Sequence, residues 1–303
     1  MRPALKSGLL PVWRDRDTVQ IGVDPRRAMA LSGMRQAALL IGLLDGSRDR
    51  SQVIAAAAGQ GIPAAVTERV LTLLAAGGVL DDFPAATLRE LPAAAKSRLA
   101  AELATASLAY RDPDGGAQSL ARRRDVAVWV SGERRIARSV ARILGAAGVT
   151  RVKIGDAQDR RPDLAVLVGL QSADLLTGLV NDRVPHLAVL AGEAIGIVGP
   201  LVIPGRTTCV RCLDYARAGK DPAWPLILAQ IATRRPDPPA CDAVLAASVA
   251  AQAAAQALAA IDKSPAASAA LNGTLELVLP DWRWRRRTWQ PHPACPCASH
   301  TGQ

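Results

Sequence analysis

The stretch VAVWVSGERRIARSVARILGAAGVTRVKIGD, residues 126–156, decides the fold of the C-terminal part of this chain. It opens with an apolar strand, Val126 to Val130, and Gly132 follows in a turn. Apolar residues then recur at helical spacing from Arg134 to Ala147, and a second short strand leads to the acidic Asp156. This order predicts a nucleotide-binding α/β unit of the Rossmann type, in which Gly132 and Asp156 would contact the cofactor.

The turn of this unit contains fewer glycines than a nucleotide site requires. Its sequence is Ser-Gly-Glu-Arg-Arg, residues 131–135, whereas a phosphate-binding turn uses two or three glycines so that backbone N–H groups approach the phosphates. Glu133 also places a negative charge at the helix N-terminus where a phosphate should bind. Arg134 and Arg135 can attract an anion, but their side chains do not replace backbone N–H groups that approach the phosphates closely. A modified nucleotide site remains an alternative interpretation, but the sequence favours a Rossmann scaffold that no longer binds nucleotide.

The elements predicted downstream extend this unit into a sheet. Further parallel strands are predicted at residues 164–168 and 187–190, a crossover helix at 173–181, and a pair of strands on the far side of the sheet at 192–203. Asp242 can cap a long alanine-rich helix, and a final hairpin ends the domain. The helix covers residues 243–261, and the hairpin strands cover 274–279 and 283–289.

Four cysteines form two close pairs, Cys209 with Cys212 and Cys295 with Cys297. Each pair of thiolates spaced this closely can supply two of the four ligands of a tetrahedral zinc ion. The two pairs lie far apart in the chain, so the ion would act as a structural staple inside a larger fold. His292 and His300 flank the second pair, and either histidine can replace a cysteine as a ligand. The alternative is two unrelated pairs of thiols, which the shared close spacing disfavours.

Length and charge set broad limits. The chain has 303 residues, which fits one large domain or two modest ones, and half of its residues are apolar. The formal net charge of +10 permits an acidic partner but does not decide the fold. Residues 1–13 contain no long apolar run, and we expect no membrane-spanning stretch, signal peptide or membrane partner. An odd number of cysteines, four of them at metal-ligand spacing, fits a reducing cytoplasm.

Short strands and helices alternate in the N-terminal third. The predicted strands cover residues 9–13, 18–21, 28–31 and 79–80. The predicted helices cover residues 36–44, 52–58 and 64–76, with Ser51 as the cap of the second. This order predicts a small winged-helix-like domain over residues 1–83. A helical linker over residues 84–122, with a helix from Pro92 to about Tyr110, would join it to the Rossmann-like domain over residues 123–303.

Winged-helix-like domains bind DNA or peptides, and the exposed residues of the third helix indicate which of these two functions is expected. DNA binding calls for Arg, Asn or Gln along its exposed face, but this helix offers Arg69 and little else of that kind. Capture of an extended peptide as an added strand fits better. The candidate peptide-binding residues are Ala28, Met29, Ala30 and Leu31 in the third strand and Arg69 and Leu73 in the helix.

Several local sequences sharpen this interpretation. They are VGPLV at 198–202, PGRT at 204–207, CVRCLD at 209–214, DPAWP at 221–225, Cys241-Asp242 and His292-Pro293. Together with the Rossmann-like unit and the split cysteine pairs, they resemble the ThiF/MoeB family of ubiquitin-activating-like adenylyltransferases. Within that family they look like the ThiF-like proteins of azole-forming peptide biosynthesis. The resemblance covers nearly the whole chain.

The resemblance implies an N-terminal domain that binds the leader of a ribosomally made precursor peptide, a structural zinc ion, and a separate modifying enzyme of the YcaO type as partner. It also implies a possible homodimer. Adenylating members carry an arginine-containing segment and a lysine after the ribose acid, and an aspartate at a later strand end. Here only residues 157–161 separate Asp156 from Pro162, and the later strand ends Val168-Gly169-Leu170. These departures argue against ATP as a cofactor.

We therefore expect an α/β protein that acts as a leader-peptide-binding scaffold without catalysis of its own. The alternatives are an ATP-dependent adenylyltransferase and a DNA-binding regulator, and a nucleic-acid partner is not expected. Cys241 precedes a helix N-terminus, which would favour a reactive thiolate, but a small packing residue beside Asp242 is the preferred interpretation. The tryptophans and arginines of residues 282–289 can stack on nucleic acid, yet an alternating strand explains them more simply.

Overall fold

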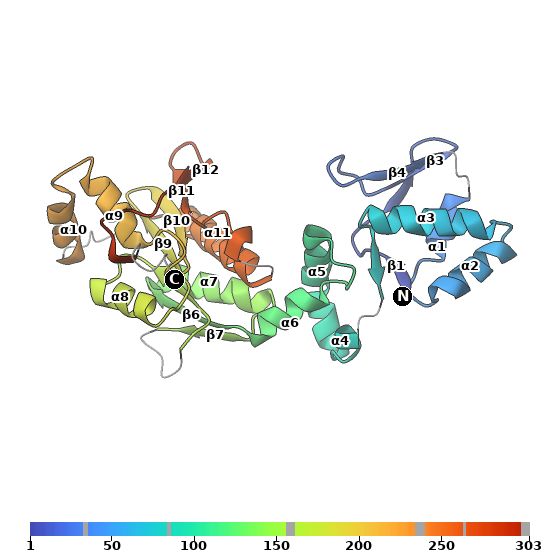
Figure 1. The fold of residues 1–303 in the computed structure, drawn as a ribbon, viewed down its shortest axis with the longest axis horizontal. Coiled ribbons are helices and arrows are strands. Elements are labelled where there is room, and N and C mark those ends of the chain that lie inside the picture. Colours follow the sequence, from blue (N-terminus) through green and yellow to red (C-terminus); the bar gives the residue numbers. More distant parts are fainter. Residues whose placement is uncertain (33–35, 84–85, 156–160, 234–239, 263–264, 298–303) are drawn as a thin grey trace. The chain divides into compact units, whose positions relative to one another are not determined.

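The computed structural model describes residues 1–32, 36–83, 86–155, 161–233, 240–262 and 265–297. The chain divides into two compact units, Met1–Ala121 and Arg122–Gln303 (Figure 1). Each unit has a hydrophobic core of its own. Asp156 and His300, two of the predicted site residues, lie outside the described residues.

Unit 1 contains two small antiparallel sheets. β1 (Pro3–Leu5) pairs with β5 (Leu80–Asp82), and β2 (Pro11–Trp13), β3 (Thr18–Ile21) and β4 (Met29–Ser32) form a three-stranded sheet in that order. β1 was not among the predicted strands. Its three residues pair with a strand near the other end of the unit, and such a non-local partner leaves no local signal.

The described residues of unit 1 also form the helices α1 (Ala37–Gly42), α2 (Arg50–Gly59), α3 (Ala64–Ala76), α4 (Ala86–Arg89) and α5 (Ala93–Tyr110). Leu31 of β4 packs with Val70 and Leu74 of α3 in the core of the unit. The predicted cap of α2 was wrong. Asp49 accepts the hydrogen bond from the Gln52 N–H, and the Gln52 side chain accepts one from the Asp49 N–H, which makes a capping box.

Unit 2 contains a seven-stranded mixed sheet in the order β12-β11-β10-β9-β8-β6-β7. Its parallel strands are β6 (Ala127–Gly132), β7 (Arg151–Ile154), β8 (Leu164–Val168) and β9 (His186–Gly192). Its antiparallel additions are β10 (Ile195–Val202), β11 (Gly273–Val278) and β12 (Trp284–Thr288). The prediction of two strands within 192–203 was wrong, because one strand, β10, forms a hairpin with β9.

Helices cover both faces of this sheet. α7 (Arg134–Ala146) and α11 (Ala243–Asp262) share the larger core, and α8 (Ala173–Asn181) packs on Trp129 and Leu167 in a smaller cluster. α11 lies very close to β10, since a Cβ at Gly196 would come within 2.4 Å of Val249 Cγ2. Two further helices, α9 (Val210–Ala218) and α10 (Trp224–Thr233), follow β10.

One more helix, α6 (Ala117–Asp125), was not predicted, and it crosses the division between the two units. Within unit 2, Arg123 of α6 forms a buried ion pair with Asp262 at the end of α11, with 2.6 Å between Arg123 Nη2 and Asp262 Oδ2. The polar sequence of α6 lacks the apolar periodicity on which helix prediction depends. Arg123 instead fixes the part of the helix that belongs to unit 2.

α11 is long and apolar enough, by length and composition, to cross a membrane. The expectation that no stretch would pass this test was therefore wrong. Nine of its residues are nevertheless buried within unit 2, among them Leu245, Val249 and Ala253. A core helix with small side chains passes the same test, and α11 has that place in the fold.

Candidate functional site

The four predicted sulfur ligands lie together in unit 2. Cys209 is the N-cap of α9 and Cys212 lies in its first turn, while Cys295 and Cys297 follow β12. Their sulfur atoms all lie within 4.8 Å of one another. None of the cysteines forms a disulfide. Distant parts of the chain therefore converge on one four-thiol cluster.

The spacing of these sulfurs suits a tetrahedral metal ion such as zinc. The Sγ–Sγ distances are 3.8 Å for Cys209–Cys212, 3.6 Å for Cys209–Cys295, and 3.3 Å for both Cys209–Cys297 and Cys212–Cys297. A zinc–sulfur bond of about 2.3 Å separates tetrahedral sulfurs by about 3.8 Å. The cluster can therefore hold such an ion with small adjustments of the side chains.

His292 lies beside the cluster, but its ring is engaged elsewhere. Its Nδ1 accepts a hydrogen bond from the Ala294 N–H at 3.2 Å, and its ring stacks on Tyr215 with 5.2 Å between centroids. Its backbone N–H donates to Cys212 Sγ at 3.3 Å. His292 thus supports the cluster through its backbone, in the way that second-layer groups orient metal ligands.

Burial governs the protonation of the thiols. Burial raises the pKa of Cys209 to about 12 and also raises the pKa of Cys297. Burial opposes ionisation of Cys212 as well, but hydrogen bonds from the His292 backbone and the neighbouring cysteines outweigh it, so the pKa of Cys212 is lowered. The cluster without an ion therefore retains protons, and a zinc ion that binds as a thiolate complex must release them.

The turn after β6 differs from a phosphate-binding turn in its geometry. Gly132 has φ +108°, and a Cβ there would lie 1.7 Å from the carbonyl oxygen of Val168. Close packing of β6 against β8 thus explains this glycine without a nucleotide. Glu133 closes the N-terminus of α7, because its carboxylate accepts hydrogen bonds from the N–H groups of Arg135 at 2.9 Å and Ile136 at 2.8 Å. A phosphate would need these same N–H groups.

Cys241 and His186 lie in structural surroundings. Burial raises the pKa of the partly buried Cys241 thiol, and the Arg135 guanidinium donates to the Cys241 carbonyl oxygen at 2.6 Å. Asp242 caps α11 as predicted, with 2.7 Å from the Leu245 N–H to Asp242 Oδ1. His186 is buried, its Nδ1 lies 2.9 Å from the Val184 carbonyl oxygen, and burial lowers its pKa.

The arginine-rich strand β12 contacts the core through Trp284. Trp284 packs against the main core of unit 2, and the arginines of the strand are exposed. Arg287 reaches Glu276 at 3.8 Å and lies over the Trp289 ring at 5.4 Å, while Arg286 Nε donates to the Ala269 carbonyl oxygen. These arginines contact neighbouring residues of the same unit, but the expected alternation between a packed and a solvated face is not seen, because residues 285–288 are all exposed.

In unit 1, β4 is an edge strand with a free side. The Gly22 N–H bonds to Leu10 and the Arg14 N–H bonds to Thr18, so alternate residues of β3 face β2. The remaining residues of β3 face β4 and pair with Met29 and Leu31. Ala30 and Ser32 therefore direct their backbone groups away from β3, and no described strand pairs with them there.

The predicted peptide-binding residues fall into two groups. Leu31 belongs to the core at 3% exposure, and Met29 is partly buried beside α3, since a Cβ at Gly77 would lie 2.6 Å from Met29 Sδ. Leu73 is 38% exposed and precedes Gly77 by one turn of α3. The surface side chains among the predicted residues are Ala30, Arg69 and Leu73, with Ala28 partly buried.

Pro11 of β2 was missed in the sequence, although it bears on which edge of the sheet is open. Its place opposite Ile21 directs its nitrogen away from β3, and a proline nitrogen carries no hydrogen. The outer side of β2 therefore lacks the donor that another residue at position 11 would supply. The signal in the sequence was a proline within the strand predicted at residues 9–13, and prolines inside strands mark edge strands.

The fold and the cluster define a two-unit α/β protein whose large mixed sheet carries a four-cysteine centre able to hold a metal ion such as zinc. No family model matches the sequence, and no curated protein matches it.

Among solved structures, the chain is similar to the heterocyclase TruD, with a TM-score of 0.71 and 19% identity over 98% of this chain and 42% of TruD. A heterocyclase in complex with substrate and cofactor gives a TM-score of 0.72 and 16% identity over 98% of this chain and 39% of that one. E. coli MccB with AMPCPP and MccA gives 0.70 and 13%, over 98% of this chain and 99% of MccB. This chain thus spans about two fifths of the heterocyclase chains and nearly all of MccB. At these identities the similarity concerns the fold.

Proposed function

We propose that this chain binds an extended peptide, the leader of a ribosomally made precursor, on the free edge of β4 and presents it to a separate modifying enzyme of the YcaO type. The observation that carries the proposal is the side of β4 at Ala30 and Ser32 to which no strand of the described residues pairs. An extended chain can add to such an edge through main-chain hydrogen bonds. Unit 1 would then serve as a winged-helix-like recognition domain.

The sheet favours β4 over β2 as the acceptor. On the β2 side, Pro11 removes one of the donors that an added strand would need. On the β4 side, Ala30 and Ser32 each keep a donor and an acceptor. A peptide that adds to this sheet therefore gains a full ladder only beside β4.

The flank of α3 next to β4 offers the side-chain contacts. Met29 lies against Gly77 at the end of α3, the exposed Leu73 precedes Gly77 by one turn, and Arg69 precedes Leu73 by another. In this proposal, Met29 and Leu73 provide an apolar surface for the peptide. Side chains of an added strand alternate between its two faces, so those on one face would meet this surface. The peptide that fits has apolar residues at alternate positions and an acidic residue near Arg69.

Unit 2 would act in this scheme as a scaffold without catalysis. Glu133 occupies the N–H groups at the start of α7, and Gly132 serves the packing of two strands. The four-thiol cluster has the donor set of a closed structural zinc site, because four sulfur ligands leave no open coordination position. These features support a structural role for unit 2 rather than a catalytic one.

A second candidate function is ATP-dependent adenylation. The fold similarity to E. coli MccB, solved with ATP at a TM-score of 0.68 and 13% identity, favours it. Titration calorimetry of the full-length chain with Mg-ATP, together with a pyrophosphate-exchange assay, separates the two functions. We expect no binding below about 1 mM and no exchange, because a nucleotide would have to displace the Glu133 cap. Micromolar binding or exchange would establish the second function instead.

Peptide binding is tested with paired proline variants of the full-length chain. Ala30→Pro removes an outward N–H from β4, and Trp13→Pro makes the same change on the β2 edge. The probe is the N-terminal half of a short precursor encoded beside this gene, measured by fluorescence anisotropy. We expect Ala30→Pro to weaken binding by about tenfold or more and Trp13→Pro to leave it unchanged. Equal effects of the two variants would contradict the proposal.

A further inference from the structure

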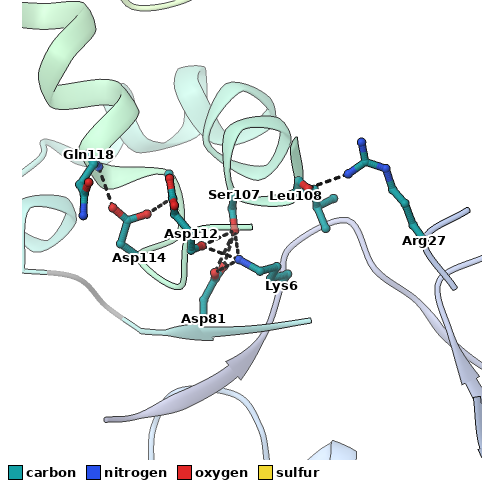
Figure 2. Close-up of polar contacts among 9 residues, drawn as sticks. Lys6, Arg27, Asp81, Ser107, Leu108, Asp112, Asp114 and Gln118 are labelled. Atoms are coloured by element: carbon teal, nitrogen blue, oxygen red, sulfur yellow. Dashed lines mark hydrogen bonds and ion pairs between the residues drawn. The ribbon is translucent and has the colours of Figure 1, made fainter. Parts of the chain in front are cut away.

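Lys6 is a fully buried lysine at the end of β1. Its Nζ lies 2.5 Å from Asp81 Oδ1, 2.5 Å from Ser107 Oγ and 2.6 Å from the carbonyl oxygen of Asp112 (Figure 2). The Ser107 hydroxyl also donates to Asp81 Oδ1 at 2.8 Å. An ammonium group has three donors, and all three are satisfied here. The charge therefore fixes the end of α5 to β1 and β5.

α5 depends on this end for its position. Only Leu99, Ala106 and Ser107 are buried among its eighteen residues. Leu99 packs in a small cluster with residues of α4 and α6, separate from the main core of unit 1. A helix with so little apolar burial gains little stability from packing. The attachment at Ser107 is therefore the main link between α5 and the sheets of the unit.

The same end of α5 also contacts the β3–β4 turn. Arg27 lies in that turn, and its Nη1 donates to the carbonyl oxygen of Leu108 at 2.6 Å (Figure 2). α5 ends at Tyr110, so Leu108 is one of the last residues, whose carbonyl groups have no partner within the helix. A cation at a helix C-terminus is also favoured by the helix dipole. Arg27 therefore braces the hairpin that carries β4 against α5.

We infer that Arg27 is a positioning residue for peptide binding, through which the end of α5 holds the β3–β4 hairpin in the shape that accepts an added strand. This inference rests on the proposed function, since it concerns the same edge of β4. Peptide binding and the stability of the C-terminal end of α5 are then linked. A peptide on β4 stabilises the hairpin, and through Arg27 it stabilises the last turn of α5.

Arg26 provides a matched control. It lies in the same turn and carries the same charge, but its guanidinium pairs with Asp24 at 2.7 Å instead of α5. Arg26→Gln and Arg27→Gln therefore remove one exposed charge each, and only the second breaks the contact with Leu108. Any general attraction of an acidic peptide to this turn is lost equally in both variants.

The probe is the tightest binder selected from a random peptide library on the full-length protein and counter-selected against the Ala30→Pro variant. We expect Arg27→Gln to raise its Kd by about fivefold more than Arg26→Gln does, at equal melting temperatures. Hydrogen exchange should show that the peptide slows exchange at residues 105–112 in the wild type and in Arg26→Gln, but not in Arg27→Gln.

The outcomes separate the two proposals. If no peptide survives the counter-selection, the β4 edge takes no strand, and both the proposed function and this inference fall. If a peptide survives but the two variants bind it equally, only the inference falls. Unchanged exchange at residues 105–112 in the wild type, which needs no variant, would overturn the inference in the same way.

Discussion

Cys209 is the residue on which the four-thiol cluster depends most directly. It caps α9, and its sulfur lies within 3.8 Å of those of Cys212, Cys295 and Cys297. Without an ion, burial keeps this thiol protonated, because its pKa is raised to about 12. A bound metal ion would replace those protons and join the start of α9 to the chain after β12. The metal would thus act on stability rather than on chemistry.

Replacing Cys209 tests this view. We expect Cys209→Ser to lower zinc content from about one ion per chain to near zero and to destabilise unit 2 by about 3 kcal/mol or more. Cys241→Ser is the control, since Cys241 lies outside the cluster and should keep the metal. Elemental analysis and thermal unfolding measure both variants. A Cys209→Ser protein of unchanged stability would contradict the view that a metal ion at this cluster stabilises unit 2.

Cys241 itself allows a test by pH. Burial raises its pKa above the ordinary value of 9.0, so the reactive thiolate is scarcer at neutral pH than in a free cysteine. In zinc-loaded protein, alkylation of Cys241 by iodoacetamide should be slower than that of N-acetylcysteine at pH 7. The rate should keep rising with pH beyond 9. Faster reaction than the free thiol would restore the alternative of a reactive cysteine.

At the scale of elements, the attachment of α5 depends on the buried pair of Lys6 and Asp81. Removing one partner leaves the other charge buried and unpaired, which typically costs about 3–5 kcal/mol. We therefore expect Lys6→Met to destabilise unit 1 by that amount. The double variant Lys6→Met/Asp81→Leu should recover most of the loss, because an apolar pair of similar size is well tolerated. Urea unfolding of the full-length variants measures both, and a double variant as unstable as the single one would contradict this account.

Local sequence signals predicted most helices and strands. The predicted bounds of α3, 64–76, and of β3, 18–21, match the structure, since a proline, apolar spacing and the Gly77-Gly78 pair mark the helix. Among the elements that were not predicted, which also include α4, α9 and α10, β1 and α6 depend on partners distant in the sequence. The same reason hid the role of Lys6, whose three partners lie 75 to 106 residues away.

The site shows the same division between local and distant information. Spacing alone suggested the cysteine pairs, and the structure brings the four sulfurs together. For Glu133 the sequence predicted only a negative charge at the start of a helix, and its capping hydrogen bonds to Arg135 and Ile136 appear in the structure alone. The contact that requires Gly132, the carbonyl oxygen of Val168, comes from a strand predicted separately, so a glycine that packs strands looked like a glycine that binds phosphate.

At the scale of the whole molecule, the two compact units have separate cores and separate polar clusters. We expect calorimetry of the full-length chain to show two unfolding transitions. Removal of the metal with a chelator should shift only the transition of unit 2, and Lys6→Met should shift only that of unit 1. A single transition that moves with both treatments would show that the units unfold together.

The unequal edges of the three-stranded sheet have one more consequence. Fibre growth by edge pairing needs two open edges per molecule, so that each copy both accepts and offers a strand. Here Pro11 interrupts the β2 side, and only β4 can accept. Two copies that meet through β4 would close as a pair in which neither three-stranded sheet keeps an edge able to accept a full ladder. A protein that keeps one sheet edge open for a guest chain is thereby protected from polymerising through that edge.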